Sequence, residues 1–233
     1  MDAIETIQIR LNQARERIAQ AEARFGRVPS SVRLMAVSKT FLADDVYGAL
    51  INGQQHFGEN YLQEALTKMA DARLSGQHIT WHFISPLQSN KTKKIAAHFD
   101  WVHTVDNLIV AQRLNDQRPD QLPPLNICLQ INISNEIGKT GANLEELPEL
   151  ASAVAQLQRL RLRGLMAIPK PSTDFEQQRQ PFRALRKALE NLRTTGLELD
   201  TLSIGMSGDL EAAIAEGATM VRVGTAIFGP RHP

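Results

Sequence analysis

Eight short apolar segments of strand length alternate along this chain with longer segments of helical period, after one opening helix. The expected strands are Arg33–Ser38, Gln55–Gly58, Thr80–Ile84, Trp101–Thr104, Leu125–Ile133, Leu162–Ala167, Thr201–Ile204 and Thr219–Val223. The expected helices between them are Ala43–Ile51, Asn60–Ala72, Asn90–Phe99, Asn107–Asp116, Leu144–Leu157, Asp174–Thr194 and Asp209–Glu216. Strict alternation of this kind predicts an α/β fold with parallel strands joined by right-handed crossovers.

Two architectures fit that alternation, a closed (β/α)₈ TIM barrel and an open doubly wound sheet. Eight strands are enough to close a barrel, and the length of 233 residues is typical of one. An open sheet usually carries a glycine-rich turn after its first strand, whereas this strand ends in Ser38-Lys39-Thr40. We therefore favour the barrel and expect one domain over residues 1–233.

The first 25 residues predict an amphipathic helix with a stripe formed by Ile4, Ile7, Leu11, Ala14, Ile18, Ala21 and Phe25. Gly26 follows the stripe, as is typical of a helix end. Only nine residues follow Gly224, which are too few for a full eighth helix after the last strand. We expect the N-terminal helix to take that place. A second boundary signal is Asn143 with Glu146, which resembles a capping box for the helix from Leu144.

The composition excludes several classes of protein. With 26 basic and 25 acidic residues the formal net charge is +1, which argues against a general nucleic-acid binder. The single cysteine, Cys128, cannot form an internal disulfide. No apolar run approaches the ~20 residues of a membrane span, and the N-terminus does not resemble a signal peptide. We expect a cytoplasmic protein that does not enter membranes.

Active sites of TIM barrels lie at the C-terminal ends of the strands, and Lys39 ends the first strand there. It has the same parity as Met35 and Val37, so it faces the mouth of the barrel if those two face the interior. One interpretation is a lysine that extends into water. The other is an amine that forms a Schiff base.

The loops after the seventh and eighth strands form the second signal. Ser207 lies where a strand passes into a helix, and Gly224 with Thr225 repeats this arrangement. These loops are the common phosphate site of the fold, since they offer backbone N–H groups and hydroxyl donors. Alternatively, Ser207 is only a helix cap and Gly224 only a turn residue.

Arg222 and His82 are further candidates on the strands. An arginine in a barrel mouth needs an acceptor, either a neighbouring carboxylate or a ligand. A phosphate site, a Schiff-base lysine and an arginine together are typical of pyridoxal phosphate (PLP) sites, where arginine can meet the pyridine nitrogen. His82 alternates with Trp81 and Phe83 and is either a site residue or a hydrogen-bonded structural histidine.

Six motifs in order along the chain resemble the pyridoxal-phosphate homeostasis proteins, the YggS/PROSC family. They are Val37-Ser38-Lys39-Thr40, Phe57-Gly58-Glu59-Asn60-Tyr61, Trp81-His82-Phe83-Ile84, Leu87-Gln88-Ser89-Asn90-Lys91, Gly164-Leu165-Met166 and Arg222-Val223-Gly224-Thr225-Ala226-Ile227-Phe228-Gly229. The resemblance covers essentially the whole chain. It implies a barrel like the N-terminal domain of alanine racemase, which is fold type III of the PLP-dependent proteins.

The resemblance also implies roles for eight residues. Lys39 would hold PLP as an aldimine, Arg222 would meet the pyridine nitrogen, and the phosphate would contact Ser207, Gly224 and Thr225. The surroundings of the ring would be lined by Asn60, His82 and Met206. Two positions depart from the family pattern, because Ser85 stands where glycine is expected and Gly208 where an acid is usual.

The resemblance implies a protein of PLP homeostasis that is not an enzyme and affects amino-acid metabolism indirectly. Its partners would be PLP and PLP-dependent apo-enzymes, and it would be a monomer or a weak dimer. The alternative is a PLP-dependent amino-acid racemase on the same barrel. Racemisation needs an acid/base on each face of the substrate, and Lys39 supplies only one. A Schiff-base aldolase fits the individual residues but not the motif set.

Overall fold

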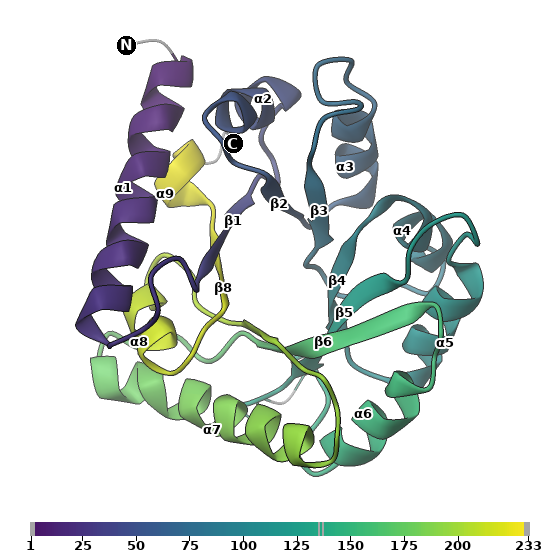
Figure 1. The fold of residues 1–233 in the computed structure, drawn as a ribbon. Helices are drawn as coiled ribbons and strands as arrows, with labels where there is room; N and C mark the ends of the chain where they lie inside the picture. Colours follow the sequence, from purple (N-terminus) through teal and green to yellow (C-terminus); the bar gives the residue numbers. More distant parts are fainter. Residues whose placement is uncertain (1–2, 135, 137, 231–233) are drawn as a thin grey trace.

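A computed structural model describes residues 3–134, 136 and 138–230 of the chain. Its strands form a closed barrel in which each strand pairs in parallel with the next, and β1 pairs with β8 (Figure 1). The strands are β1 (Arg33–Val37), β2 (His56–Glu59), β3 (Thr80–Phe83), β4 (Trp101–Val105), β5 (Leu125–Ile131), β6 (Leu160–Ala167), β7 (Thr201–Ser203) and β8 (Met220–Val223). The predicted TIM barrel is confirmed, and an open sheet is excluded because it would have two edge strands, whereas here every strand pairs with a neighbour on both sides.

Helices surround the barrel in the predicted order (Figure 1). They are α1 (Ala3–Arg24), α2 (Ala43–Ile51), α3 (Leu62–Met69), α4 (Thr92–His98), α5 (Leu108–Gln117), α6 (Leu147–Ala155), α7 (Phe175–Thr194), α8 (Leu210–Ala215) and α9 (Thr225–Phe228). Most predicted boundaries agree within three residues. The α9 turn follows β8 directly and is only one turn long, so it does not replace a full helix.

The predicted capping box before α6 is wrong. Residues 144–146 form a turn, and the helix begins three residues later than expected, at Leu147. The Asn143 side-chain amide donates to the Glu146 carboxylate at 3.4 Å, whereas in a capping box each of the two side chains would accept from the backbone N–H of the other residue. Pro148 explains the later start, because proline has no N–H and fits the first helical turn.

Helix α1 occupies the position of the missing eighth helix, as predicted. It packs against α2 on one side and against α8 and α9 on the other (Figure 1). Five of the seven residues of its stripe are buried, Ile4 and Phe25 at the ends are partly buried, and Leu11 is 0 % exposed. Arg17 adds a polar contact, because its guanidinium pairs with Glu211 of α8 at 2.6 Å. The helix therefore closes the ring of helices through both packing and charge.

The buried side chains lie in two compartments, one between the strands and the helices and one inside the barrel. Phe57, Phe99 and Phe182 are among the largest fully buried side chains of the outer compartment. Inside the barrel, Trp101, Cys128 and Met166 form a separate apolar cluster. Side chains of alternating strand positions fill these two compartments, because successive residues of a strand point to opposite faces.

Three histidines cross the barrel interior in a hydrogen-bonded row, which we call the imidazole chain. His56 Nδ1 lies 2.9 Å from His82 Nε2, and His82 Nδ1 lies 2.9 Å from His103 Nε2. His103 Nδ1 lies 2.9 Å from Ser203 Oγ. Since β4 and β7 are not neighbours in the sheet, this last contact passes through the inside of the barrel.

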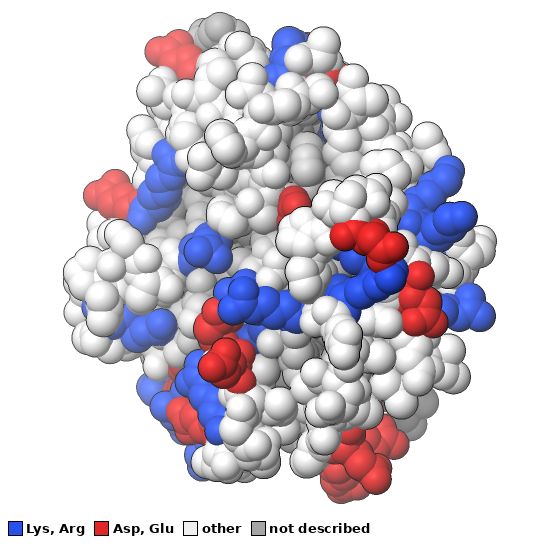
Figure 2. All heavy atoms as spheres, turned by 45° about the vertical axis from the view of Figure 1, so that its right-hand side comes forward, with Lys and Arg blue, Asp and Glu red and all other residues white. Residues whose placement is uncertain are grey.

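Acidic and basic side chains are interspersed on the face shown in Figure 2, without a continuous region of one sign. This distribution agrees with the near-neutral net charge of +1. Among the described helices, none is both long and apolar enough to cross a bilayer.

Replacing Leu11 with Ala tests the packing of α1. Loss of this fully buried side chain is expected to lower the free energy of unfolding by about 2–5 kcal/mol. Ile9 on the same helix is 41 % exposed, so Ile9→Ala is the matched control and is expected to change it little. Urea unfolding of both variants measures the difference. Equal effects of the two substitutions would contradict the packing, as would cooperative, wild-type melting of a chain that lacks residues 1–25.

The imidazole chain also predicts a pH dependence of stability. Burial lowers the pKa of His56 to about 4 and that of His103 to about 3, with Arg33 and Arg222 respectively adding repulsion. Burial also holds the pKa of His82 well below its usual value. The unfolded chain therefore binds more protons than the native state below about pH 6.5, and stability falls as the pH drops from there towards 4.

The substitution His56→Gln measures one part of that slope. Each imidazole that is charged only in the unfolded chain contributes up to about 1.4 kcal/mol per pH unit. The unfolding free energy of the variant should thus depend less steeply on pH between 6 and 4.5 than that of the wild type. His98 is exposed, so His98→Gln should leave the slope unchanged. Identical slopes for the wild type and His56→Gln would mean that His56 is charged in the native state.

Candidate functional site

A cavity of about 290 Å³ lies at the C-terminal ends of the barrel strands. Its lining comes from the segments that directly follow β1, β2, β3, β6, β7 and β8. Seven of the eight predicted site residues line it, namely Lys39, Asn60, Met206, Ser207, Arg222, Gly224 and Thr225. The structure therefore brings together residues that are up to 186 positions apart in the sequence, from Lys39 to Thr225.

Lys39 lies in a tight turn directly after β1. The next residue, Thr40, has a φ of +68°, which is the left-handed region that a β-branched side chain rarely adopts. The Thr40 N–H donates to Glu64 at 2.7 Å, and the Ser38 carbonyl accepts from Lys68 at 2.7 Å. Hydrogen bonds on both sides of Lys39 thus hold this turn in place, with Thr40 in an unusual backbone conformation.

Lys68 and Glu59 form the buried centre of this support. Lys68 is 3 % exposed and Glu59 is 0 % exposed, and their side chains are paired at 2.8 Å. Ser38 Oγ donates to the same carboxylate at 2.6 Å. Burial raises the pKa of Glu59, and the neighbouring Lys68 opposes that rise. Removal of Lys68 would leave the buried Glu59 carboxylate without its cation, which is strongly destabilising, whereas Lys68 has a second ion pair with Glu64 at 2.5 Å.

Lys68 and Glu64 carry no signal in the sequence that marks them as part of the site. Their i, i+4 spacing on α3 is an ordinary pattern for a surface ion pair, and nothing local shows that it faces β1. Glu59 belongs to the motif Phe57-Gly58-Glu59-Asn60-Tyr61, which assigns it no role of its own. Its position at the end of a barrel strand, beside Asn60, was the available signal.

Arg222 is buried on β8, with 4 % of its surface exposed. Its guanidinium donates to Ser203 Oγ at 3.0 Å, to the Ser203 carbonyl, and to the Ala167 carbonyl at 3.1 Å. In the described part of the chain it forms no ion pair with a carboxylate, so the salt-bridge alternative is wrong. Burial lowers the pKa of Arg222 to about 10, while Asp209 at longer range opposes that change. The group stays charged at neutral pH.

The loops after β7 and β8 present hydroxyl groups to the cavity. Neither Ser207 Oγ nor Thr225 Oγ1 has a hydrogen-bond partner among the described residues. Arg17 of α1 donates to the Ser207 carbonyl at 2.8 Å. The Asp209 carboxylate accepts from the Met206 N–H at 2.6 Å. Both contacts hold the loop from outside the cavity, and the one from Arg17 has no local signature in the sequence.

Gly224 lets the β8 loop lie close to β1. A Cβ at this position would lie 3.2 Å from the Val37 carbonyl oxygen, so a larger residue would push the two strand ends apart. Gly205 tolerates a side chain even less than Gly224 does, because its φ is +92° and a Cβ there would lie 2.6 Å from Ala213 Cβ. The two glycines keep the loops after β7 and β8 tightly packed beside the cavity.

Asn60, which also lines the cavity, has a side-chain oxygen without a hydrogen-bond partner in the part of the chain that the structure describes. Its Oδ1 atom is buried and has no hydrogen-bond partner among the described residues. Buried polar atoms are rarely left unpaired in folded proteins. An orphaned acceptor and an arginine without a carboxylate in one cavity indicate a missing polar ligand.

His82 is the one predicted site residue that the structure does not place in the lining of the cavity. It is 0 % exposed and belongs to the imidazole chain inside the barrel. The two departures from the family pattern also lie apart from the central contacts. The Ser85 carbonyl accepts from Thr104, and Gly208 lies at the exposed rim with open space around its Cα.

This arrangement combines a primary amine, a buried guanidinium and two free hydroxyls around one small cavity. An amine can condense with a carbonyl group, and a guanidinium can donate to a lone pair or an anion. Hydroxyls beside tightly packed glycines suit phosphate oxygens. The site is therefore suited to a small phosphorylated carbonyl compound.

Comparisons with known proteins agree with this geometry. The family model "Alanine racemase, N-terminal domain" matches residues 9–232. The pyridoxal phosphate homeostasis protein of Escherichia coli K12 is 54 % identical over 222 residues, which cover 95 % of each chain. PipY of Synechococcus elongatus, solved with PLP bound, superposes with a TM-score of 0.80 at 37 % identity, covering 91 % of this chain and 100 % of PipY.

More distant structures share the fold alone. Alanine racemase of Corynebacterium glutamicum superposes with a TM-score of 0.72 at 17 % identity, over 98 % of this chain and 61 % of the racemase. The high identity to the homeostasis proteins and their matching length distinguish this chain from the longer racemase. The chain belongs to the alanine racemase N-terminal domain family, in the group of pyridoxal phosphate homeostasis proteins.

Proposed function

We propose that this protein binds pyridoxal 5'-phosphate in the cavity at the C-terminal mouth of the barrel and takes part in its intracellular homeostasis. The observation that carries the proposal is Arg222, a buried cation held by neutral acceptors beside Lys39 in one cavity. Such a cation needs a ligand with a lone pair or a negative charge, and a pyridine nitrogen supplies the lone pair. The PLP-bound structure of PipY supports this choice of ligand.

Each lining residue then has a distinct part in binding. The Lys39 amine would bond covalently to the aldehyde carbon of the cofactor, and Arg222 would donate to the ring nitrogen. Ser207 and Thr225 would donate their free hydroxyls to the phosphate, with Gly224 allowing close approach. Two further residues would surround the ring. They are Asn60, whose Oδ1 has no hydrogen-bond partner among the described residues, and Met206, which is 36 % exposed. His82 would act only from beneath the cavity.

The same residues favour a cofactor holder over a racemase. Bound PLP supplies an electron sink for the bonds at an amino acid's Cα, most effectively when its ring nitrogen is protonated. Arg222 keeps its proton at neutral pH and would accept none, so it would leave that nitrogen unprotonated. Among the described residues that line the cavity, Lys39 is the one group suited to proton exchange. The tyrosines Tyr47 and Tyr61 do not line it.

The proposed cellular role follows from this chemistry. A protein that binds the cofactor firmly without using it would limit free aldehyde and release the cofactor to other proteins. PLP-dependent apo-enzymes are the proposed recipients, and the cytoplasm is the proposed compartment. We further propose a single domain that acts as a monomer or a weak dimer.

Replacing Lys39 with Ala tests the covalent bond. Wild-type protein with PLP should show a visible absorption band, and borohydride should reduce the bond to a stable adduct on Lys39 that peptide mass spectrometry detects. Lys39→Ala should lose both the band and the adduct. Lys91 is exposed and lies outside the cavity, so Lys91→Ala should keep both. An adduct that maps to Lys91 or Lys139 would contradict the proposed site.

Arg222 variants test the distinction between a holder and a racemase. The wild type should racemise a panel of L-amino acids no faster than free PLP, as measured by chiral chromatography. Arg222→Glu should racemise faster than the wild type, because a carboxylate can keep a proton on the ring nitrogen. Arg222→Gln removes the charge without that ability and is the matched control. Wild-type turnover of roughly 1–1000 per second, as in ordinary enzymes, would identify a racemase instead.

A further inference from the structure

The imidazole chain connects the cofactor cavity with the opposite end of the barrel. Its upper end is Ser203 Oγ, which accepts from Arg222 at 3.0 Å and lies 2.9 Å from His103. From there the row passes through His82 to His56, with 2.9 Å between successive ring nitrogens. The proposed function uses none of these imidazoles directly.

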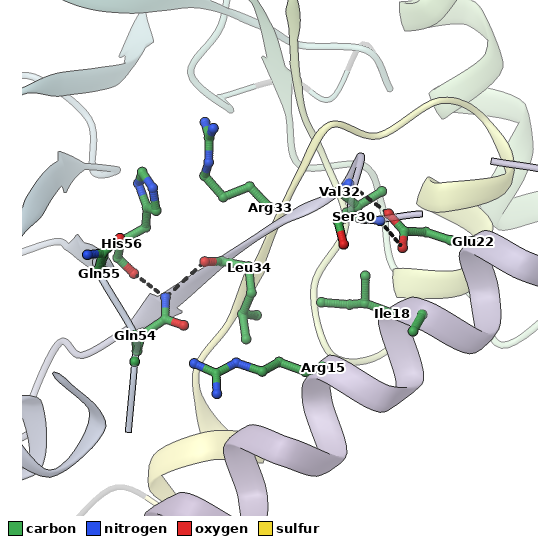
Figure 3. A pocket seen from close by; sticks show the side chains of 12 residues that line it. Arg15, Ile18, Glu22, Ser30, Val32, Arg33, Leu34, Gln54, Gln55 and His56 are labelled. Atoms are coloured by element: carbon green, nitrogen blue, oxygen red, sulfur yellow. Dashed lines mark hydrogen bonds between the residues drawn. The ribbon is translucent and has the colours of Figure 1, made fainter. Parts of the chain in front are cut away.

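The lower end of the chain opens into a cavity of about 430 Å³ at the N-terminal ends of the strands. His56 and Arg33 both line this cavity, and Figure 3 shows their side chains together on one side of it. His56 Nδ1 is used by the chain, whereas its Nε2 has no hydrogen-bond partner among the described residues. The chain therefore has one end at Arg222 and one end in contact with solvent.

Burial, reinforced by nearby positive charges, lowers the pKa of all three rings of the imidazole chain and favours their neutral form. Arg222 stands above the chain on β8, and Arg33 stands below it on β1. Burial lowers the pKa of His103 and His56, and each of these arginines lowers it further for the imidazole nearest to it. A neutral imidazole carries one hydrogen, so each ring donates through one nitrogen and accepts through the other.

The hydrogens available on Ser203 and on the three neutral imidazoles determine the direction in which hydrogen bonds are donated along the imidazole chain. Ser203 Oγ already accepts from Arg222, and its own hydrogen needs an acceptor, which His103 Nδ1 supplies at 2.9 Å. His103 must then carry its hydrogen on Nε2 and donate to His82 Nδ1, and His82 must in turn donate to His56. The opposite direction would leave the buried serine hydrogen without an acceptor among the described residues, which is unfavourable.

We propose that the imidazole chain is uniformly protonated on Nε2 and acts as a positioning device that holds the Ser203 hydroxyl as an acceptor for Arg222. His103 and His82 are then positioning residues for the arginine that faces the cofactor ring. The positioning of Arg222 for the cofactor rests on the proposed function. The direction in which hydrogen bonds are donated along the imidazole chain does not. The chain also explains why polar side chains are retained inside a barrel that otherwise packs Trp101, Cys128 and Met166.

The direction of hydrogen-bond donation along the imidazole chain is tested on the wild-type protein without added PLP. A long-range ¹H–¹⁵N correlation spectrum at pH 7 distinguishes Nε2–H, Nδ1–H and charged imidazoles by the shifts of their ring nitrogens. His56, His82 and His103 should all show the neutral Nε2–H form. His78 and His98 lie outside the chain and serve as references, and single His→Gln variants assign the signals. A neutral Nδ1–H form or a charged ring at any of the three positions would overturn the proposal.

The positioning role is tested by two substitutions at His103. His103→Leu removes both hydrogen bonds of the ring, whereas His103→Gln keeps one acceptor for Ser203 and one donor for His82. PLP affinity, followed by absorption, should fall roughly tenfold in His103→Leu, as expected for loss of a hydrogen bond that orients a charged group. His103→Gln should restore it to within about twofold of the wild type. His98→Gln is the matched control on the surface and should not change it.

The two readouts separate the possible failures. Equal PLP affinity of the wild type and a folded His103→Leu variant would overturn the positioning role, and so would equal losses in the Leu and Gln variants. If His103→Leu does not fold, His103→Gln must still bind PLP normally, and a loss larger than about twofold would count against the role. If the wild type does not bind PLP at all, the proposed function fails, while the nitrogen shifts still decide the direction of the chain.

Discussion

The parallel pairing of β1 with β8 is the interaction on which the rest of the structure depends. This pairing aligns Met35 with Arg222 and Ala36 with Val223. The C-terminal ends of β1 and β8 therefore lie side by side at the same level along the barrel axis. Lys39 and Gly224, which directly follow these strand ends, therefore lie in one cavity. The pairing also requires a cover on the outside of the barrel, and α1 provides it by packing between α2 and α8.

A buried guanidinium without a carboxylate partner is the second constraint, and it gives the site its chemical character. An ion pair would neutralise Arg222 and leave it with little affinity for a ligand. Its neutral acceptors, Ser203 and Ala167, hold the group in place and leave its charge available to the cavity. The cost of burying this cation is consistent with a site that is completed by a ligand. Burial lowers the pKa of His103 beneath this guanidinium, and the positive charge of Arg222 lowers that pKa further.

Two networks that support the site could not have been found from the sequence. Lys68 and Glu59 hold the turn that carries Lys39, and they meet only because α3 packs back against the first two strands. His103 and Ser203 are 100 residues apart and meet across the barrel interior. The period of two along each strand shows that His103 shares a face with other residues, but not which residue stands opposite. That relation depends on how strands that are not neighbours in the sheet face one another, and local patterns carry no information about it.

The sequence by itself determined the barrel, its covering N-terminal helix and eight candidate site residues, seven of which line the cavity. It could do so because strict alternation of strands and helices leaves few topologies, and because parallel strands bring their C-terminal ends to one edge. Only the tertiary structure decided that His82 lies beneath the cavity and that Arg222 has no carboxylate partner among the residues that the structure describes. Both outcomes depend on the distances between side chains from different strands, which are fixed by closure of the barrel and by the packing of its interior.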